Sequence, residues 1–97
     1  MTTIHPLRDG ELDRAVRAGR RKIALGLRPR YHLRYENVAQ FRDDPFGWFV
    51  WVAELPDVWT TAAAERDVPE VGRAVIADVL DVPPTFFDVA VEDGSGR

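Results

Sequence analysis

Residues 46–63 read FGWFVWVAELPDVWTTAA, and this stretch decides the fold that the sequence predicts. Its first part, Phe46 to Leu55, is aromatic, β-branched and apolar on both faces, which is typical of a buried strand. Pro56 and Asp57 form a turn and Val58 to Ala63 returns, so the stretch predicts a β-hairpin. Proline holds φ near about −65° and cannot take the positive-φ position of the usual two-residue turns, so we expect a type I variant there.

The flanking segments extend this hairpin into a sheet with a helix. Tyr31 to Glu36 alternate apolar and polar residues as a half-buried strand, and residues 42–45 (RDDP) have the composition of a turn. Residues 67–70 (DVPE) resemble a capping box that starts a helix running to Leu80, which residues 83–84 (PP) end. Residues 87–91 alternate again as a last strand. The predicted order is β-β-β-α-β, an α+β fold with one helix packed on the sheet.

The N-terminal segment is predicted to be a basic helix or arm. Asp9 and Gly10 mark its expected start, and Gly26 its end. Between them, a narrow apolar stripe recurs at helical spacing: Leu12, Val16, Gly19 and Ile23. We therefore divide the chain into a basic arm or helix (1–30), an α+β domain (31–93) and a flexible tail (94–97).

The composition favours a single small binding domain over an enzyme. Ninety-seven residues are too few for a second core. The chain has no cysteine and only two histidines, which leaves no thiolate metal site and little for imidazole catalysis. We expect no metal, cofactor or small-molecule substrate. The chain has neither a secretory signal nor an apolar run that could span a membrane, so we expect a cytoplasmic location.

Charge is distributed unevenly along the chain. Residues 1–34 hold nine basic and three acidic side chains, a net charge of +6, whereas residues 35–97 hold four basic and thirteen acidic ones, a net charge of −9. An acidic body would attract a basic protein and repel nucleic acid. A basic arm could contact phosphates through six side chains: Arg14, Arg17, Arg20, Arg21, Lys22 and Arg28.

The predicted sheet has more aromatic surface than one helix can cover. The second strand places Trp48, Val50 and Val52 on one face and Phe49, Trp51 and Leu55 on the other, and Trp59 follows on the third strand. Each such aromatic ring buries roughly 150–250 Å², so leaving several in water forgoes several kcal/mol. Either the Leu12–Ile23 stripe covers the second face, or another molecule does. The candidate partner-binding residues are Trp48, Trp51 and Trp59.

The carboxylates and histidines of the sequence do not form a catalytic set. Asp43 and Asp44 fall in the predicted turn, and Asp78 and Asp81 near a helix C-terminus are expected to face solvent. His32 lies on the outward side of its strand, and its same-face neighbour in the sequence is Arg34 rather than an orienting carboxylate. We therefore predict no catalytic residues.

The order of elements, together with four segments, resembles the HicB-like antitoxin family of bacterial type II toxin–antitoxin systems, in its short actinobacterial form. The resemblance covers Tyr31 to Glu92. The segments are residues 47–57 (GWFVWVAELPD), 58–62 (VWTTA), 76–83 (IADVLDVP) and 87–91 (FDVAV). The sequence departs from the family where a glycine normally follows the Pro-Asp turn, since Asp57 leads directly into Val58.

This resemblance implies a partial RNase H-like fold that lacks catalytic carboxylates, and an antitoxin that caps a small toxin, usually an mRNA-cleaving ribonuclease. Relatives that regulate their own genes often add a C-terminal DNA-binding domain, which is not expected here after residue 93. The main hypothesis is thus a non-enzymatic binding module whose partner is a small basic toxin or a second copy of the chain. The alternative is a nucleic-acid-binding regulator that acts through the arginine-rich helix.

Overall fold

The computed structural model describes residues 5–37 and 47–93. Its elements are α1 (His5–Ala24), β1 (Arg30–Asn37), β2 (Trp48–Val52), β3 (Trp59–Ala62), the 3₁₀ turn η2 (Glu65–Asp67), α2 (Val68–Leu80) and β4 (Asp88–Asp93). The predicted turn at residues 42–45, with Asp43 and Asp44, lies outside the described residues, as does the predicted tail at 94–97. The β-β-β-α-β order is confirmed, and the protein is a small α+β domain with two helices.

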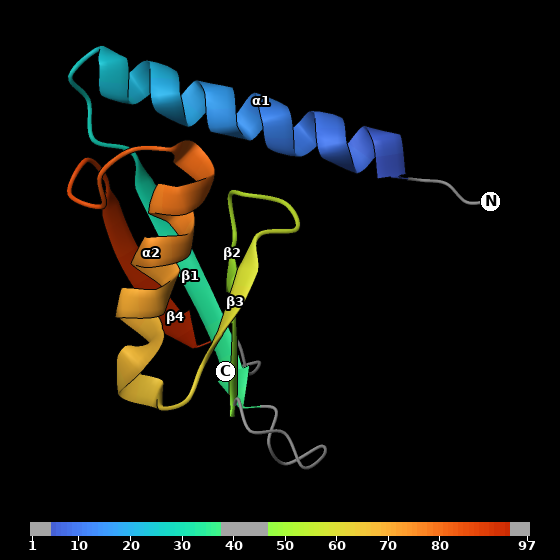
Figure 1. Ribbon diagram of the computed structural model, residues 1–97, viewed down its shortest axis with the longest axis vertical. Helices are drawn as coiled ribbons and strands as arrows, with labels where there is room; N and C mark the ends of the chain where they lie inside the picture. Colours follow the sequence, from blue (N-terminus) through green and yellow to red (C-terminus); the bar gives the residue numbers. More distant parts are fainter. Residues whose placement is uncertain (1–4, 38–46, 94–97) are drawn as a thin grey trace.

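The four strands form one mixed sheet in the order β3-β2-β1-β4. β1 pairs antiparallel with β2, β2 pairs antiparallel with β3, and β4 lies parallel to β1 on its other side. A parallel neighbour requires a crossover connection, which α2 supplies between β3 and β4. Figure 1 shows α2 lying along one face of this sheet.

The core lies between α2 and the face of the sheet that carries Leu33, Val50 and Val52, all of which are buried. From α2, the buried residues recur every four positions: Val68, Gly72, Ile76 and Leu80. Gly72 brings the helix so close to the sheet that a Cβ atom there would overlap the Leu33 side chain. The sequence predicted the valine, isoleucine and leucine face of this helix but not the central role of its glycine.

α1 starts earlier than predicted. It begins at His5 rather than near Asp9, with Pro6 in its first turn, where a missing N–H costs little. Its last residue is Ala24, and the predicted terminator Gly26 follows with a φ of 84°, while the Leu27 N–H donates to the Lys22 carbonyl at 2.9 Å in a Schellman motif.

The apolar stripe of α1 packs across the end of the domain and does not cover the second face of the sheet. Leu12, Val16 and Ile23 are partly buried against the core. Gly19 is buried, and a Cβ there would meet the Tyr31 hydroxyl, which explains a glycine in the middle of this helix. In Figure 1, α1 crosses the ends of α2 and β1, and its N-terminal half extends past the β2–β3 hairpin.

The β2–β3 connection differs from the predicted turn. β2 ends at Val52, so Leu55 does not sit beside Trp51 on a strand; it turns into the core and is buried. The Val58 N–H donates to the Leu55 carbonyl at 3.2 Å across Pro56 and Asp57. Asp57 has a φ of 65°, and proline followed by a positive-φ residue is the pattern of a type II turn rather than a type I variant.

The capping box predicted at the start of α2 does not form. The Asp67 side chain makes no capping hydrogen bond, because its backbone is in the helical region (φ −86°, ψ −8°) at the end of η2. A capping side chain normally requires an extended backbone. Pro69 still lies in the first turn, and α2 ends with Asp81 in the left-handed conformation.

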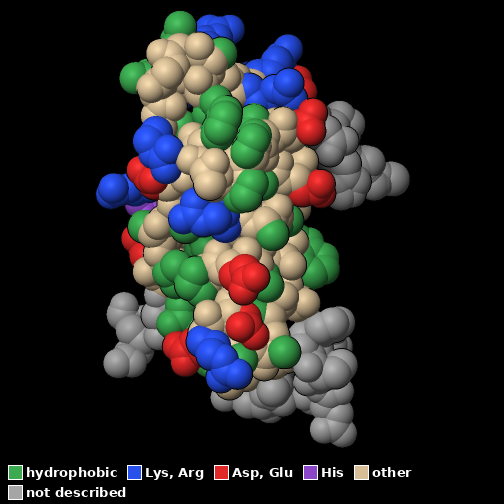
Figure 2. Space-filling model, turned by 60° about the vertical axis from the view of Figure 1, so that its left-hand side comes forward, with side chains coloured by type: hydrophobic (Ala, Val, Ile, Leu, Met, Phe, Trp, Pro, Cys, Tyr) green, Lys and Arg blue, Asp and Glu red, His purple; other side chains and the backbone are tan. Residues whose placement is uncertain are grey.

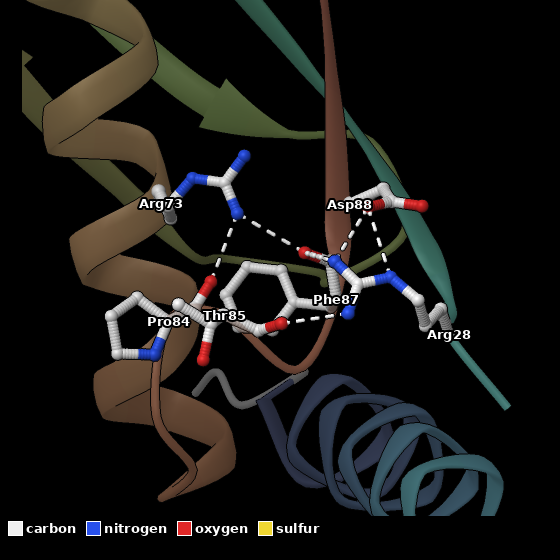
Figure 3. A network of polar contacts seen from close by, with 6 residues as sticks. All are labelled: Arg28, Arg73, Pro84, Thr85, Phe87 and Asp88. Atoms are coloured by element: carbon white, nitrogen blue, oxygen red, sulfur yellow. Dashed lines mark hydrogen bonds and ion pairs between the residues drawn. The ribbon is translucent and has the colours of Figure 1, made fainter. Parts of the chain in front are cut away.

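Two arginines fix the segment that leads into β4 (Figure 3). The Arg28 guanidinium donates to the Thr85 carbonyl at 2.8 Å and to the Asp88 carboxylate at 2.8 Å. Arg73, from α2, donates to the carbonyls of Pro84 and Phe87 at 2.9 and 3.1 Å, and its guanidinium lies 5.7 Å from the centre of the Phe87 ring. We call these contacts the arginine clamp. Figure 2 shows that apolar and charged side chains are mixed over this side of the molecule.

Acid is expected to weaken the fold through the clamp. The hydrogen bond from Arg28 is the main cause of a lowered pKa at Asp88; desolvation opposes it, and the charges of Arg28, Arg30 and Arg73 add to the lowering. A lowered pKa stabilises the fold above the unfolded-state pKa of about 3.9, and this contribution is lost as the pH falls through the folded-state pKa.

We therefore expect urea midpoints to fall as the pH drops below about 4, and Asp88→Asn to remove part of that dependence. Asp78→Asn is the matched control, because Asp78 is an exposed carboxylate on α2 that takes part in no ion pair within residues 5–37 and 47–93. The same acid slope in the wild type and in Asp88→Asn would contradict this role.

Candidate partner-binding face

The face of the sheet opposite α2, which we call the outer face, carries three aromatic side chains on neighbouring strands. β1–β2 pairing places Glu36 beside Phe49 and Arg34 beside Trp51, and β2–β3 pairing places Trp51 beside Trp59. In the described part of the chain neither helix packs on this face, because α2 packs on the opposite face and α1 crosses the end of the sheet. The outer face therefore presents aromatic surface without a helical cover.

Phe49, Trp51 and Trp59 form an aromatic cluster. The Phe49 ring lies 5.5 Å from the Trp51 ring and 5.4 Å from the Trp59 ring, centre to centre, with tilts of 33° and 34°. These separations are those of favourable offset aromatic pairs. Trp59 is still 56% exposed, the highest value for any aromatic residue in the described part of the chain. Phe49 and Trp51 are partly buried, so the exposed aromatic area of the cluster belongs mainly to Trp59.

The aromatic cluster lines an open groove of about 830 Å³. One side is formed by the β2–β3 connection, and Glu11 of α1 reaches its rim from the overhanging helix. The complete lining is Glu11, Arg34, Glu36, Phe49, Trp51, Val52, Ala53, Leu55, Pro56, Asp57, Val58 and Trp59. A mainly apolar hollow with a few charged groups at its rim has the form of a ligand or partner site.

The charged side chains of this groove are mainly acidic. Arg34, the one cation in its lining, is already paired with Glu92 at 3.4 Å. Glu11 and Glu36 take part in no ion pair or side-chain hydrogen bond among the described residues. The groove therefore has negative charge that its own lining does not neutralise.

The three predicted partner-binding tryptophans do not lie together. Trp51 and Trp59 are in the aromatic cluster, whereas Trp48 lies on the core face, partly buried, with its ring 5.6 Å from that of Tyr35. Phe49 takes the third place in the cluster. Its position two residues before Trp51 already put it on that face, so the alternation of the strand was the signal for it.

The six basic residues assigned to nucleic-acid binding also separate. Arg14, Arg20, Arg21 and Lys22 are exposed on α1. Arg17 is exposed as well but pairs with Asp13 at 3.1 Å. Arg28 lies beyond the helix and is held in the arginine clamp, so it does not belong to the basic surface of α1.

His32 has a carboxylate partner that its sequence neighbours did not indicate. Glu54 follows the end of β2 and accepts a hydrogen bond from the His32 backbone N–H at 2.8 Å, while its other oxygen contacts the imidazole Nδ1. The Ala53 N–H also donates to the His32 carbonyl at 2.9 Å. These contacts hold the β2–β3 connection against β1, and neither His32 nor Glu54 lines the groove. Glu54 also affects Tyr31: burial raises the pKa of the Tyr31 hydroxyl, and the Glu54 charge has a smaller effect in the same direction.

Within 5–37 and 47–93, no cluster of three or more histidine or carboxylate side chains could hold a metal ion. None of the described helices combines the length and the apolar character needed to cross a bilayer.

Fold and site together define a small α+β domain with a mixed four-stranded sheet, covered by a helix on one face and aromatic on the other. No family model, curated protein or solved structure matches the chain. The HicB-like resemblance therefore stays a prediction.

Proposed function

We propose that this protein is a non-enzymatic binding module of the HicB-like antitoxin type, which neutralises a small basic toxin, an mRNA-cleaving ribonuclease, by covering it. The observation that carries the proposal is the aromatic cluster on the outer face, with Trp59 56% exposed above an acidic groove. Tryptophan is enriched among the residues that dominate binding energy at protein interfaces. An uncovered aromatic patch on a small domain is typical of a partner surface.

Two further features support this proposal. The confirmed β-β-β-α-β order agrees with the core that the resemblance implies. The net charge of −9 in residues 35–97 would attract a basic ribonuclease and accelerate the encounter. The cytoplasmic location and the absence of a cofactor belong to this proposal as well.

Co-expression tests the proposal. The tagged full chain is produced with the product of the neighbouring small open reading frame, and we expect the two to co-purify and the antitoxin to restore growth. Trp59→Ala should weaken the complex by about 2 kcal/mol, roughly 30-fold in Kd, because an exposed tryptophan at the centre of an interface is a typical hot spot.

Phe86→Ala is the matched control for this experiment. Phe86 is also exposed (45%) but lies in the loop before β4, outside the groove, so the complex and growth should be unaffected. Absence of both co-purification and growth rescue would overturn the proposal. If no second protein co-purifies and the chain forms a homodimer whose contacts depend on Trp59, the partner is a second copy of the chain and not a toxin.

A second candidate function, nucleic-acid binding through α1, is favoured by one observation: Arg14, Arg20, Arg21 and Lys22 are all exposed, and none is ion-paired among the described residues. A double charge reversal, Arg20→Glu with Arg21→Glu, tests it better than removal of the arm, because Leu12, Val16 and Ile23 pack on the core.

If α1 binds phosphates, a duplex DNA titration should show an affinity that falls steeply with salt, and the double reversal should abolish it. Equal retention of DNA by the wild type and by the reversed variant would eliminate α1 as the binding element.

A further inference from the structure

We infer that the groove on the outer face is a cation-recognition site, which takes an arginine side chain presented by the protein partner. This inference rests on the proposed function and deepens it, since it names the chemical group that the surface receives. It is carried by three features of the groove: aromatic walls, carboxylates without partners, and a cation that is already neutralised.

The walls supply the aromatic surface that a guanidinium requires. Trp51 and Trp59 are directly paired across β2 and β3, and Phe49 lies within 5.5 Å of both rings. Tryptophan is the best aromatic partner for a cation, which binds within about 6 Å of the ring centre. The arginine clamp shows the same chemistry within this molecule, because the Arg73 guanidinium lies 5.7 Å from the centre of the Phe87 ring.

The rim supplies the negative charge. Glu36 of β1 is paired with Phe49 of β2, and α1 contributes Glu11 to the lining of the groove. Both carboxylates lack an ion pair among the described residues, while Arg34 is paired with Glu92. An incoming cation therefore gains two carboxylates and faces a single positive group whose charge Glu92 already balances.

These two features favour arginine over other ligands. A guanidinium is planar, stacks on aromatic rings and donates bidentate hydrogen bonds to carboxylates, whereas an ammonium is a compact and strongly hydrated charge. Stacked nucleobases would use the same rings, but their phosphates would be repelled by Glu11 and Glu36. A basic toxin offers arginine, which fits the partner proposed above.

The three tryptophans allow a direct test by NMR. The indole N–H signals of the full chain are followed while a blocked Gly-Arg-Gly peptide is added. We expect the Trp51 and Trp59 signals to shift and saturate with a Kd on the order of millimolar, while the Trp48 signal, on the opposite face, stays in place. A Gly-Lys-Gly peptide should bind several-fold more weakly, and the uncharged citrulline peptide should produce no saturable shift.

Two variants with matched controls locate the site. Glu36→Gln and Trp59→Ala should each weaken arginine binding at least about fivefold, a loss of about 1 kcal/mol. Glu70→Gln, an exposed carboxylate on α2, and Phe86→Ala, an exposed aromatic outside the groove, should leave it unchanged. Equal shifts with arginine and citrulline, or shifts that do not saturate, would overturn the inference.

The outcomes for this site and for the proposed function are distinguishable. A complex with the toxin that is sensitive to Trp59→Ala, together with no arginine binding, would keep the function and remove the cation site. Arginine binding by a chain that forms no complex would do the reverse. A homodimer that dissociates on Arg20→Glu with Arg21→Glu would assign the arginine to α1 of a second copy and overturn the partner named here.

Discussion

Phe87→Ala is expected to lower the free energy of unfolding by about 3–5 kcal/mol, the cost of deleting a large buried ring. Phe87 is fully buried, and its ring meets the Tyr31 ring edge-to-face at 5.8 Å. The substitution also removes the aromatic surface beneath Arg73. Because small domains are stable by only about 5–15 kcal/mol, the variant should be close to unfolded at 37 °C.

Urea unfolding at 25 °C, followed by tryptophan fluorescence and by circular dichroism, measures this effect. Phe86→Ala provides the control, because it removes the same ring from the adjacent position, where the side chain is 45% exposed. That change should cost less than about 1 kcal/mol. Similar losses for the two variants would show that Phe87 is not the centre of the packing between β4, β1 and α2.

Gly72→Ala is the second large effect, and its sign is opposite to that expected from helix propensity. Alanine in place of glycine in a helix normally stabilises by about 1 kcal/mol. Here the added Cβ would lie 2.3 Å from a Leu33 side-chain carbon, and Leu33 is fully buried in the core. Overpacking of this kind costs about 1–3 kcal/mol, which exceeds or cancels the propensity gain and gives an expected net loss of up to about 2 kcal/mol.

The cause can be isolated by a double-mutant cycle and a control glycine. Combining Gly72→Ala with Leu33→Ala should cost less than the sum of the two single changes, because the smaller side chain makes room for the new methyl group. Gly10→Ala on α1 is the control, since the nearest atom to its added Cβ would be 4.0 Å away on Arg14. It should leave stability unchanged or raise it. Additive effects at Gly72 and Leu33 would rule out the steric explanation.

The sequence predicted the strands and helices correctly where the spacing of apolar residues within one segment decides the structure. The alternation of Tyr31 to Glu36 predicted β1 and its two faces, and the apolar spacing after Val68 predicted α2 and the side it buries. The predictions were wrong where backbone geometry decided the outcome. Asp67 does not cap α2 because η2 already holds it in a helical conformation, and Leu55 is buried because β2 ends three residues before it.

The candidate site was also predictable only where it depends on residues that are close together in the sequence. The period of two placed Phe49 and Trp51 on one face, but only the pairing of β2 with β3 brings Trp59 beside them. Three contacts join residues far apart in the chain: Glu54 with His32, Arg28 with Asp88, and Glu11 with the groove. Such contacts depend on how elements pack together, which no periodicity in a single sequence encodes.

The position of β4 has a consequence during protein synthesis. β1 lies between β2 and β4, and its parallel neighbour is the last element of the described chain. On a ribosome adding about 5–20 residues per second, one edge of β1 stays without its partner for several seconds after β1 has been made. During that interval the nascent hairpin has neither α2 on its core face nor β4 beside β1. Apolar surface and an unpaired strand edge that are exposed in this way favour aggregation until the last strand is added.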